Sequence, residues 1–239
     1  EAVYNTSGGS GALEASDFTL SISGGTALVN DTPSSISVSG NVYTLGLNLT
    51  NTPDGAETVT VVPSSSTAIY DASGNAASTS QSNNTVSLND QTAPIAFTTG
   101  TVVATGGTVV TNYWNSTNTG IDITVPVAND TTLTGGTIQL RAKIDSESYS
   151  NLGSAYTIQS NDLNKNKTIS ISASVFEALS GGIEDSEVVT VTAIITDASG
   201  NTRTGTASSN TITIDQTSPT ITGTTVASNN STISVTFSE

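Results

Sequence analysis

The sequence contains no histidine, cysteine or methionine, and only 5 of its 239 residues are Lys or Arg. Without Cys and His there are no disulfides, thiolate nucleophiles, zinc ligands or Ser-His-Asp arrangements. Its 20 Asp and Glu residues give a net charge of −15, which opposes binding to nucleic acid, since that binding requires basic residues. No apolar run approaches the roughly 18 residues of a membrane helix. We therefore expect no enzymatic activity, no nucleic-acid partner and no membrane insertion.

Ser and Thr are abundant, at 79 residues, and a regular alternation runs through them. Apolar and polar residues alternate with a period of two, which places one face of a β-strand on a core and the other in water. Only residues 175–179 favour a helical turn. The chain is predicted to be all-β, with short strands spaced as in a β-sandwich. The alternating segments are 43–50, 58–62, 121–127, 138–144, 169–175, 188–195 and 211–214.

An internal repeat divides the chain. Asp-Ala-Ser-Gly-Asn occurs at 71–75 and again at 197–201, and each copy is followed by Asp-Gln-Thr-x-Pro, at 90–94 and 215–219. The offset of about 125 residues fits one sandwich domain per period. The prediction is a domain over 1–94 that lacks its opening strands, a complete domain over 95–218, and the opening strands of a further repeat over 219–239.

The two ends of the chain complement each other. Joining the tail to the head, with Glu239 overlapping Glu1, gives a continuous ISVTFSEAVYN. We hypothesise that the chain is one period of a tandem array. The strands that domain 1 lacks would then come from a preceding unit, either covalently or by strand exchange with another copy.

The segments 16–25, 69–78 and 196–201, together with the Asp-Gln-Thr-x-Pro linkers, resemble the tandem immunoglobulin-like repeats of large bacterial surface adhesins, of the biofilm-associated and swimming-motility types. The resemblance implies antiparallel β-sandwich domains arranged end to end, located outside the cell. It implies neighbouring repeats of the same protein as partners, often with calcium at the joints between domains.

Sandwich topology predicts where the acidic residues lie. Each Asp-Ala-Ser-Gly-Asn loop belongs to the end where its domain begins, and each Asp-Gln-Thr linker to the end where it finishes. Asp90 should therefore meet the loop of Asp197 and Asn201, and Asp130 can join them. Converging carboxylates without His or Cys favour a hard cation such as Ca²⁺, which takes six to eight oxygen ligands. The corresponding candidates at the outer ends of the two domains are Asp71, Asn75 and Asp215.

Simpler interpretations remain open. Each Asp-Ala-Ser-Gly-Asn segment could be a turn that needs no ion, because Asp caps its own backbone and Gly supplies positive φ. Asp54 and Glu57 are expected in an exposed turn. Tyr113 and Trp114 could stack a sugar, but a lone aromatic pair more often covers one end of a core. The functional alternatives to a calcium-stiffened adhesin stalk are a filament or surface-layer subunit assembled by strand exchange, and a carbohydrate-binding module.

Overall fold

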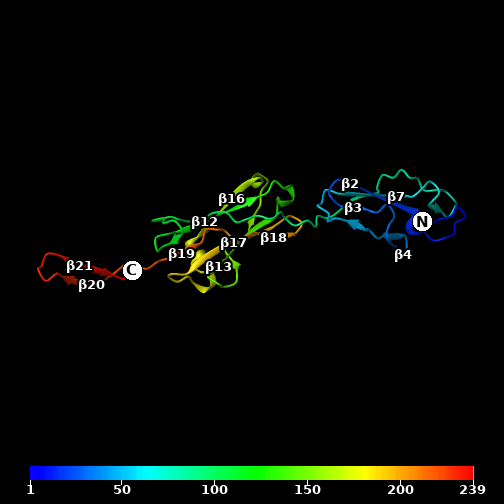
Figure 1. Cartoon of the computed structure of the whole chain (residues 1–239). Coiled ribbons are helices and arrows are strands. Elements are labelled where there is room, and N and C mark those ends of the chain that lie inside the picture. The colour runs from blue at the N-terminus through cyan, green and yellow to red at the C-terminus, as the bar shows by residue number, and fades with distance from the viewer. Residues whose placement is uncertain (239) are drawn as a thin grey trace. The chain divides into compact units, whose positions relative to one another are not determined.

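A computed structural model describes residues 1–238, and the chain divides into unit 1, residues 1–92, and unit 2, residues 93–239. Strands dominate both units (Figure 1), as the alternation predicted. Within residues 1–238 the helical turns are confined to five short segments. These are η1 Ala15–Asp17, η2 Thr131–Leu133, η3 Ser160–Asp162, α1 Ala173–Phe176 and η4 Leu179–Gly181.

Besides a terminal hairpin, the described residues of unit 2 form two larger sheets, of which the smaller has three antiparallel strands. Strand β12 (Gly120–Val127) is its centre, with β10 (Val102–Thr105) on one side and β16 (Lys165–Ser172) on the other. β12 and β16 are paired over eight residues, with Ile123 opposite Ile169. No strand pairing within residues 1–92 of unit 1 is as long as this one.

The second sheet of unit 2 is built on β13 (Thr137–Ile144) and β17 (Val188–Thr196), which pair antiparallel over eight residues. Shorter strands extend it on both sides. They are β11 Tyr113–Trp114, β14 Ser150–Asn151, β15 Tyr156–Thr157, β18 Thr202–Thr204 and β19 Ile212–Ile214.

One apolar core lies between the two sheets of unit 2. Every second residue of β12 and β13 is buried, including Ile123 and Leu140, and these residues belong to a single packed cluster. Trp114 and Phe176 pack together within this cluster, with ring centroids 4.7 Å apart. Each large buried apolar side chain contributes roughly 1.5–3 kcal/mol, so this core is the main source of the stability of unit 2.

Unit 1 has a comparable strand set but shorter pairings. β2 (Phe18–Ser23), β7 (Thr58–Pro63) and β9 (Thr85–Ser87) form a three-stranded sheet. Its other strands form two-stranded pairs. These pairs are β1 Val3–Tyr4 with β8 Tyr70–Asp71, β3 Leu28–Val29 with β6 Leu49–Thr50, and β4 Ile36–Ser39 with β5 Val42–Leu45.

The core of unit 1 is small. Six apolar residues are buried in unit 1, against 24 in unit 2, so unit 1 derives much less of its stability from apolar burial. Its largest buried cluster contains Leu13, Ala68 and Ile69, with Phe18 and Tyr43 packed partly against it.

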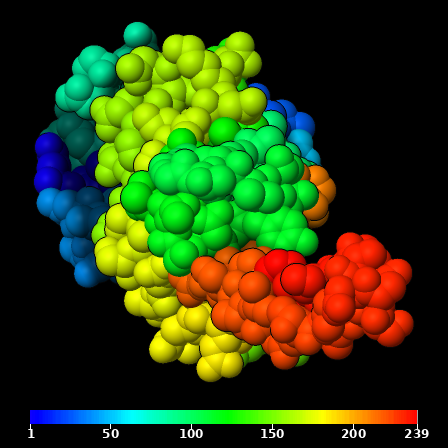
Figure 2. Space-filling view, turned by 90° about the vertical axis from the view of Figure 1, so that its left-hand side faces the viewer, coloured from blue at the N-terminus to red at the C-terminus, as the bar shows by residue number. Residues whose placement is uncertain are grey.

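The last segment of the chain is a β-hairpin of β20 (Ile221–Val226) and β21 (Ile233–Phe237). Within the described residues these two strands pair only with each other. Every residue of both strands is exposed. In Figure 2 no other segment covers the side of this hairpin, in orange to red, that is turned to the viewer.

Two predicted segments need local correction. The segment 169–175 was predicted to be a strand throughout, but β16 ends at Ser172 and α1 begins at Ala173. The helical turn predicted over 175–179 therefore begins two residues earlier. The segment 43–50 is interrupted, because β5 ends at Leu45 and β6 begins at Leu49.

Candidate functional site

The two Asp-Ala-Ser-Gly-Asn loops have the same hydrogen bonds. In unit 1, Asp71 Oδ1 accepts the backbone N–H groups of Ser73 and Asn75, each at 2.8 Å, and Asp71 Oδ2 accepts Asn75 Nδ2 at 2.7 Å. In unit 2, Asp197 makes the same three bonds with Ser199 and Asn201, each at 2.9 Å. The repeated sequence therefore encodes a repeated loop geometry.

The backbone conformation of each loop requires glycine at its fourth position. Gly74 has φ +87° and Gly200 has φ +94°, a region that side chains with a Cβ rarely adopt. The loop closes through Asp71 N–H to Asn75 O and Asp197 N–H to Asn201 O, both at 3.0 Å. Since a carboxylate has about four acceptor positions, three are filled within the loop. The turn is thus closed by its own hydrogen bonds, and limited capacity for a further ligand remains.

The two loops differ in burial. Asp197 is only 3% exposed, whereas Asp71 is half-exposed. The side-chain hydrogen bond from Asn75, with backbone bonds from Asn75, Ser73 and Gly74, lowers the pKa of Asp71. Asp71 is therefore ionised at neutral pH.

On the unit 2 side, the Asp197 loop is hydrogen-bonded to a neighbouring turn. Ala198 N–H, in the Asp197 loop, donates to Thr132 O at 2.9 Å, so the loop adjoins the turn that Asp130 begins. Asp130 Oδ1 accepts both the backbone N–H and the hydroxyl of Thr132, at 2.9 and 2.7 Å. Arg203, just beyond the loop, donates from Nε to Pro94 O at 2.8 Å, which fixes the first residues of unit 2 beside it.

On the unit 1 side, the linker is hydrogen-bonded to the turn at Pro53. The linker residues Gln91 and Thr92 both donate to Pro53 O at 2.9 Å, through a backbone N–H and a hydroxyl respectively. Asp90 Oδ1 accepts Thr92 N–H at 2.8 Å. Asp90 therefore lies beside the turn that contains Asp54, at the opposite end of unit 1 from Asp71, because β9 pairs with the beginning of β7.

Glu57 was expected in an exposed turn, and this expectation is wrong. Its side chain is completely buried, and its two carboxylate oxygens accept backbone N–H groups at 2.9–3.2 Å. Burial by itself would raise the pKa of Glu57, but the backbone hydrogen bonds outweigh it and lower the pKa to about 2. The acid is a structural anchor that ties two turns together. The four donors are Thr26, Ala27, Asp54 and Gly55.

The end of unit 2 repeats this arrangement in part. Glu187 Oε2 accepts Glu184 N–H at 2.7 Å, as Glu57 accepts Asp54 N–H three residues before it. Asp185 accepts the backbone N–H of Gln216 and the hydroxyl of Thr217, and these bonds lower its pKa, that from Thr217 most. Gln216 and Thr217, which follow Asp215 in the linker, are therefore hydrogen-bonded to Asp185 of unit 2.

The predicted calcium site combines residues of both units. Within residues 1–238, Asp and Glu side chains form no group of three or more placed to hold a metal ion. The donors on each side, carboxylates and an amide with no nitrogen or sulfur ligand, have the chemistry that Ca²⁺ requires. Calcium at the joint of Asp90, Asp130, Asp197 and Asn201 stays a prediction, as it does at the outer ends for Asp71, Asn75 and Asp215.

Trp114 is not available as a stacking surface. Its side chain is fully buried, and its indole Nε1 donates to Glu177 Oε1 at 3.2 Å. Tyr113, the other half of the predicted platform, is 43% exposed. Trp114 is therefore part of the core, and the structure contradicts a sugar platform that includes it.

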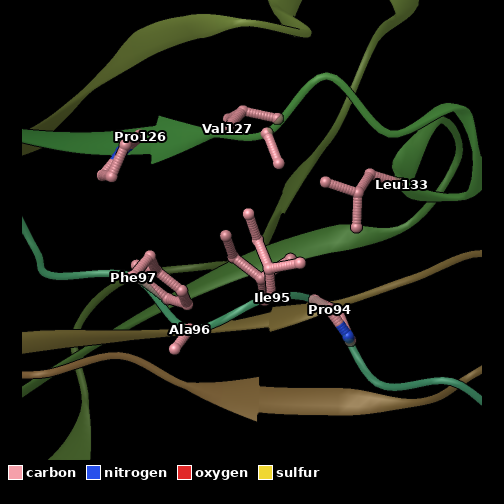
Figure 3. A pocket seen from close by; sticks show the side chains of 9 residues that line it. Pro94, Ile95, Ala96, Phe97, Pro126, Val127 and Leu133 are labelled. Atoms are coloured by element: carbon pink, nitrogen blue, oxygen red, sulfur yellow. The ribbon is translucent and has the colours of Figure 1, made fainter.

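An apolar cavity of about 210 Å³ lies in unit 2 beneath the loops of Asp130 and Asp197. In Figure 3 the side chains of Ile95, Val127 and Leu133 converge on it. All nine of its lining residues are apolar, so this cavity offers no acid, base or nucleophile to a ligand.

One cluster was not predicted from the sequence. Asp162 is buried and accepts the hydroxyl of Tyr156 at 2.8 Å, and Lys167 Nζ lies 3.2 Å from Asp162 Oδ1 and 4.1 Å from the Tyr156 ring centroid. Asp162 also accepts Gln159 N–H at 2.9 Å. Burial opposes ionisation of Asp162, but this backbone bond and the contacts with Tyr156 and Lys167 lower its pKa. The cluster ties η3 to β16 within unit 2.

The chain matches no protein-family model and no curated protein. No helix within residues 1–238 has the length and apolarity required to cross a membrane.

Proposed function

We propose that this chain is a non-catalytic structural segment of an extracellular rod or stalk, built from immunoglobulin-like β-sandwich domains and stiffened by Ca²⁺ at the joints. The observation that carries this proposal is the repetition of one loop with one set of hydrogen bonds, at Asp71 and at Asp197. Each loop is followed by the same Asp-Gln-Thr-x-Pro linker. Repeated domains with repeated linkers are the sequence signature of a linear array.

The architecture of unit 2 supports the sandwich part of the proposal. Its two sheets share one core, as in immunoglobulin-like domains of about 100 residues. The segment around Thr98 bridges in parallel to Thr206, whereas β10 further along pairs with β12 of the other sheet. The opening part of the domain therefore bridges to the segment that follows β18 and then pairs with β12.

The calcium part rests on charge and position. On the unit 2 side, the bond from Ala198 N–H to Thr132 O joins the loop of Asp197 to the turn of Asp130, and Asp90 lies at the end of unit 1 that leads into the linker. Carboxylates that converge repel each other by several kcal/mol unless a cation neutralises them. In the proposed joint, Asp90, Asp130 and Asp197 supply carboxylate oxygens and Asn201 supplies its amide oxygen. The ion would limit the angles that a bare linker leaves open.

The experiment is a thermal and chemical unfolding series of the 239-residue chain in millimolar Ca²⁺ and in chelator. An ion that binds only the folded joint stabilises it by about 2.7 kcal/mol at 100 times its Kd. Trp114 is the only Trp, so its fluorescence reports the unfolding of unit 2. Calcium is expected to raise the midpoint of this transition.

The matched control uses the repeated loop. Asp197→Asn and Asp71→Asn disturb the same three hydrogen bonds, so their effects in chelator should be similar. Only Asp197→Asn is expected to remove the calcium response, because Asp71 belongs to the other end of unit 1. Absence of any calcium response in the parent chain, or its persistence in Asp197→Asn, contradicts the calcium joint.

A further inference from the structure

The chain enters and leaves unit 2 along segments that run in the same direction. The entry segment is residues 94–100, and the exit segment, residues 202–214, contains β18 and β19. β18 pairs with the end of β17 and β19 with its beginning, so they lie toward opposite ends of unit 2 (Figure 1). Thr98 bridges in parallel to Thr206, and β11 pairs in parallel with β19. The exit segment therefore has a parallel neighbour toward each of its ends.

Two backbone hydrogen bonds join the entry segment to the exit segment. Thr206 N–H donates to Phe97 O, and Thr99 N–H donates to Thr206 O, both at 2.9 Å. Thr99 is buried, and a hydrogen bond is electrostatically stronger in such low-dielectric surroundings than in water. The first residues of unit 2 are therefore firmly attached to its last segment.

Two side chains add to these backbone bonds. Arg203 Nε donates to Pro94 O at 2.8 Å, and Ser208 Oγ donates to Gly100 O at 2.6 Å. Ser208 is buried. The four bonds follow one another in the same order along both segments, from Pro94 with Arg203 to Gly100 with Ser208, as parallel pairing requires.

Tension along the chain loads these bonds in shear. The entry segment is pulled at its first residue and the exit segment at its last, so the two segments are drawn in opposite directions along their own axes. Hydrogen bonds between strands run across the strand direction. They therefore share the load, whereas two segments pulled apart from the same end lose their bonds one after another.

The exit end of unit 2 is held in a similar way. Thr213 N–H donates to Asn112 O at 2.8 Å, and Asp215 N–H donates to Trp114 O at 2.9 Å. β11 thus holds β19 at the point where the chain leaves, and Trp114 is fully buried in the core. A pull on Asp215 therefore acts against the core rather than against a free strand end.

We propose that unit 2 bears tension, and that residues 94–100 and 203–208 form a shear clamp that keeps it folded when the chain is pulled lengthwise. Unfolding under force is governed by the unfolding rate rather than by the free energy of unfolding. The clamp breaks before the core opens, so it sets that rate. The proposal rests on the proposed function only in that a stalk is pulled along its length.

Single-molecule pulling of the 239-residue chain tests the clamp through the direction of the load. The chain has no Cys, so introduced Cys residues at exposed positions define where the handles attach. Handles at Gln91→Cys and Ser218→Cys draw the two segments in opposite directions, whereas handles at Gln91→Cys and Ser199→Cys pull them apart from the same end. The first rupture of unit 2 should need at least about twofold more force with the first pair, because its bonds are loaded together. Equal forces, or a higher force with the second pair, overturn the proposal.

Ser208→Ala tests the clamp by removing one of its bonds. With the first pair of handles, the unfolding rate at a fixed force should rise about five- to tenfold, the effect of one lost hydrogen bond on a barrier. The matched control is Tyr156→Phe, which removes a hydrogen bond to Asp162 outside the clamp. Both variants should lower the denaturation midpoint reported by Trp114, but the control should change the rate under force less than about twofold. Equal acceleration by both variants, or none by Ser208→Ala, overturns the clamp.

The pulling experiments are made in chelator, so that no ion at the joint of Asp90 and Asp197 contributes to the force. Failure of the calcium joint removes the calcium response and leaves the dependence on pulling direction. Failure of the clamp removes the dependence on pulling direction and leaves the calcium response. The two proposals can therefore fail separately.

Discussion

Unit 1 and unit 2 contain the same loop and the same linker motif, yet they are stabilised differently. Unit 2 encloses Trp114 and Phe176 in a core shared by two sheets. Unit 1 buries Leu13, Ala68 and Ile69 in its largest cluster and relies on the carboxylate of Glu57 to tie its turns. The difference shows that the same loop and linker motifs do not bring the same amount of apolar burial.

The largest expected effect is a loss of unit 2 stability on Phe176→Ala. Truncating a buried Phe costs about 3–5 kcal/mol through lost burial and the resulting cavity. Chemical denaturation followed by Trp114 fluorescence should show this loss. The matched variant Phe18→Ala, at a half-buried site in unit 1, should leave the Trp114 transition unchanged and lower only an earlier circular-dichroism transition, by about 1–2 kcal/mol. Equal shifts of both transitions in both variants would contradict the division into independent units.

Glu57→Gln is expected to destabilise unit 1 by about 3 kcal/mol, because an amide places donors against buried backbone N–H groups that a carboxylate accepts. The control is Glu187→Gln, at the corresponding half-buried position of unit 2, where the side chain accepts Glu184 N–H. This change should cost less than about 1 kcal/mol. The circular-dichroism transition of unit 1 measures the first effect and Trp114 fluorescence the second. A small effect at Glu57 would mean that its anchoring role is wrong.

Lowering the pH should weaken the Glu57 anchor, with a smaller effect on the stability of unit 1 than the substitution has. The pKa of Glu57 is about 2 in the folded unit and 4.5 without the fold, so its stabilisation is complete above pH 4.5 and is lost as the pH falls toward 2. Unit 1 of the parent chain should weaken over this window, and unit 1 of Glu57→Gln should change less. The lowered pKa values of Asp162 and Asp185 give unit 2 its own acid sensitivity, which the Glu57 substitution should not alter.

Much of the fold could be predicted from the period of two. The segments predicted at 121–127, 138–144 and 188–195 are β12, β13 and β17 within one residue at each end. These strands are long and have one buried face, so their alternation is strict. Short edge strands such as β14 and β15 bury little and leave no such pattern.

The candidate site could be predicted only as far as the loops. The geometry of Asp71 and Asp197 follows from local turn chemistry, which the five-residue motif contains. The burial of Glu57 could not be predicted, because its partners Thr26 and Ala27 are about 30 residues away in sequence. Gly24-Gly25, directly before Thr26, could have signalled a close approach of the backbone, because a Cβ at Gly25 would collide with the Glu57 side chain.

The measurement that tests the central claim most directly is amide hydrogen exchange of the 239-residue chain over a range of concentrations. The claim is that the large core of unit 2 stabilises its fold more than the small core of unit 1 does. The account predicts that amides of β13 and β17 exchange much more slowly than amides of β2 and β7 at every concentration. Equal protection of the two strand pairs would contradict it.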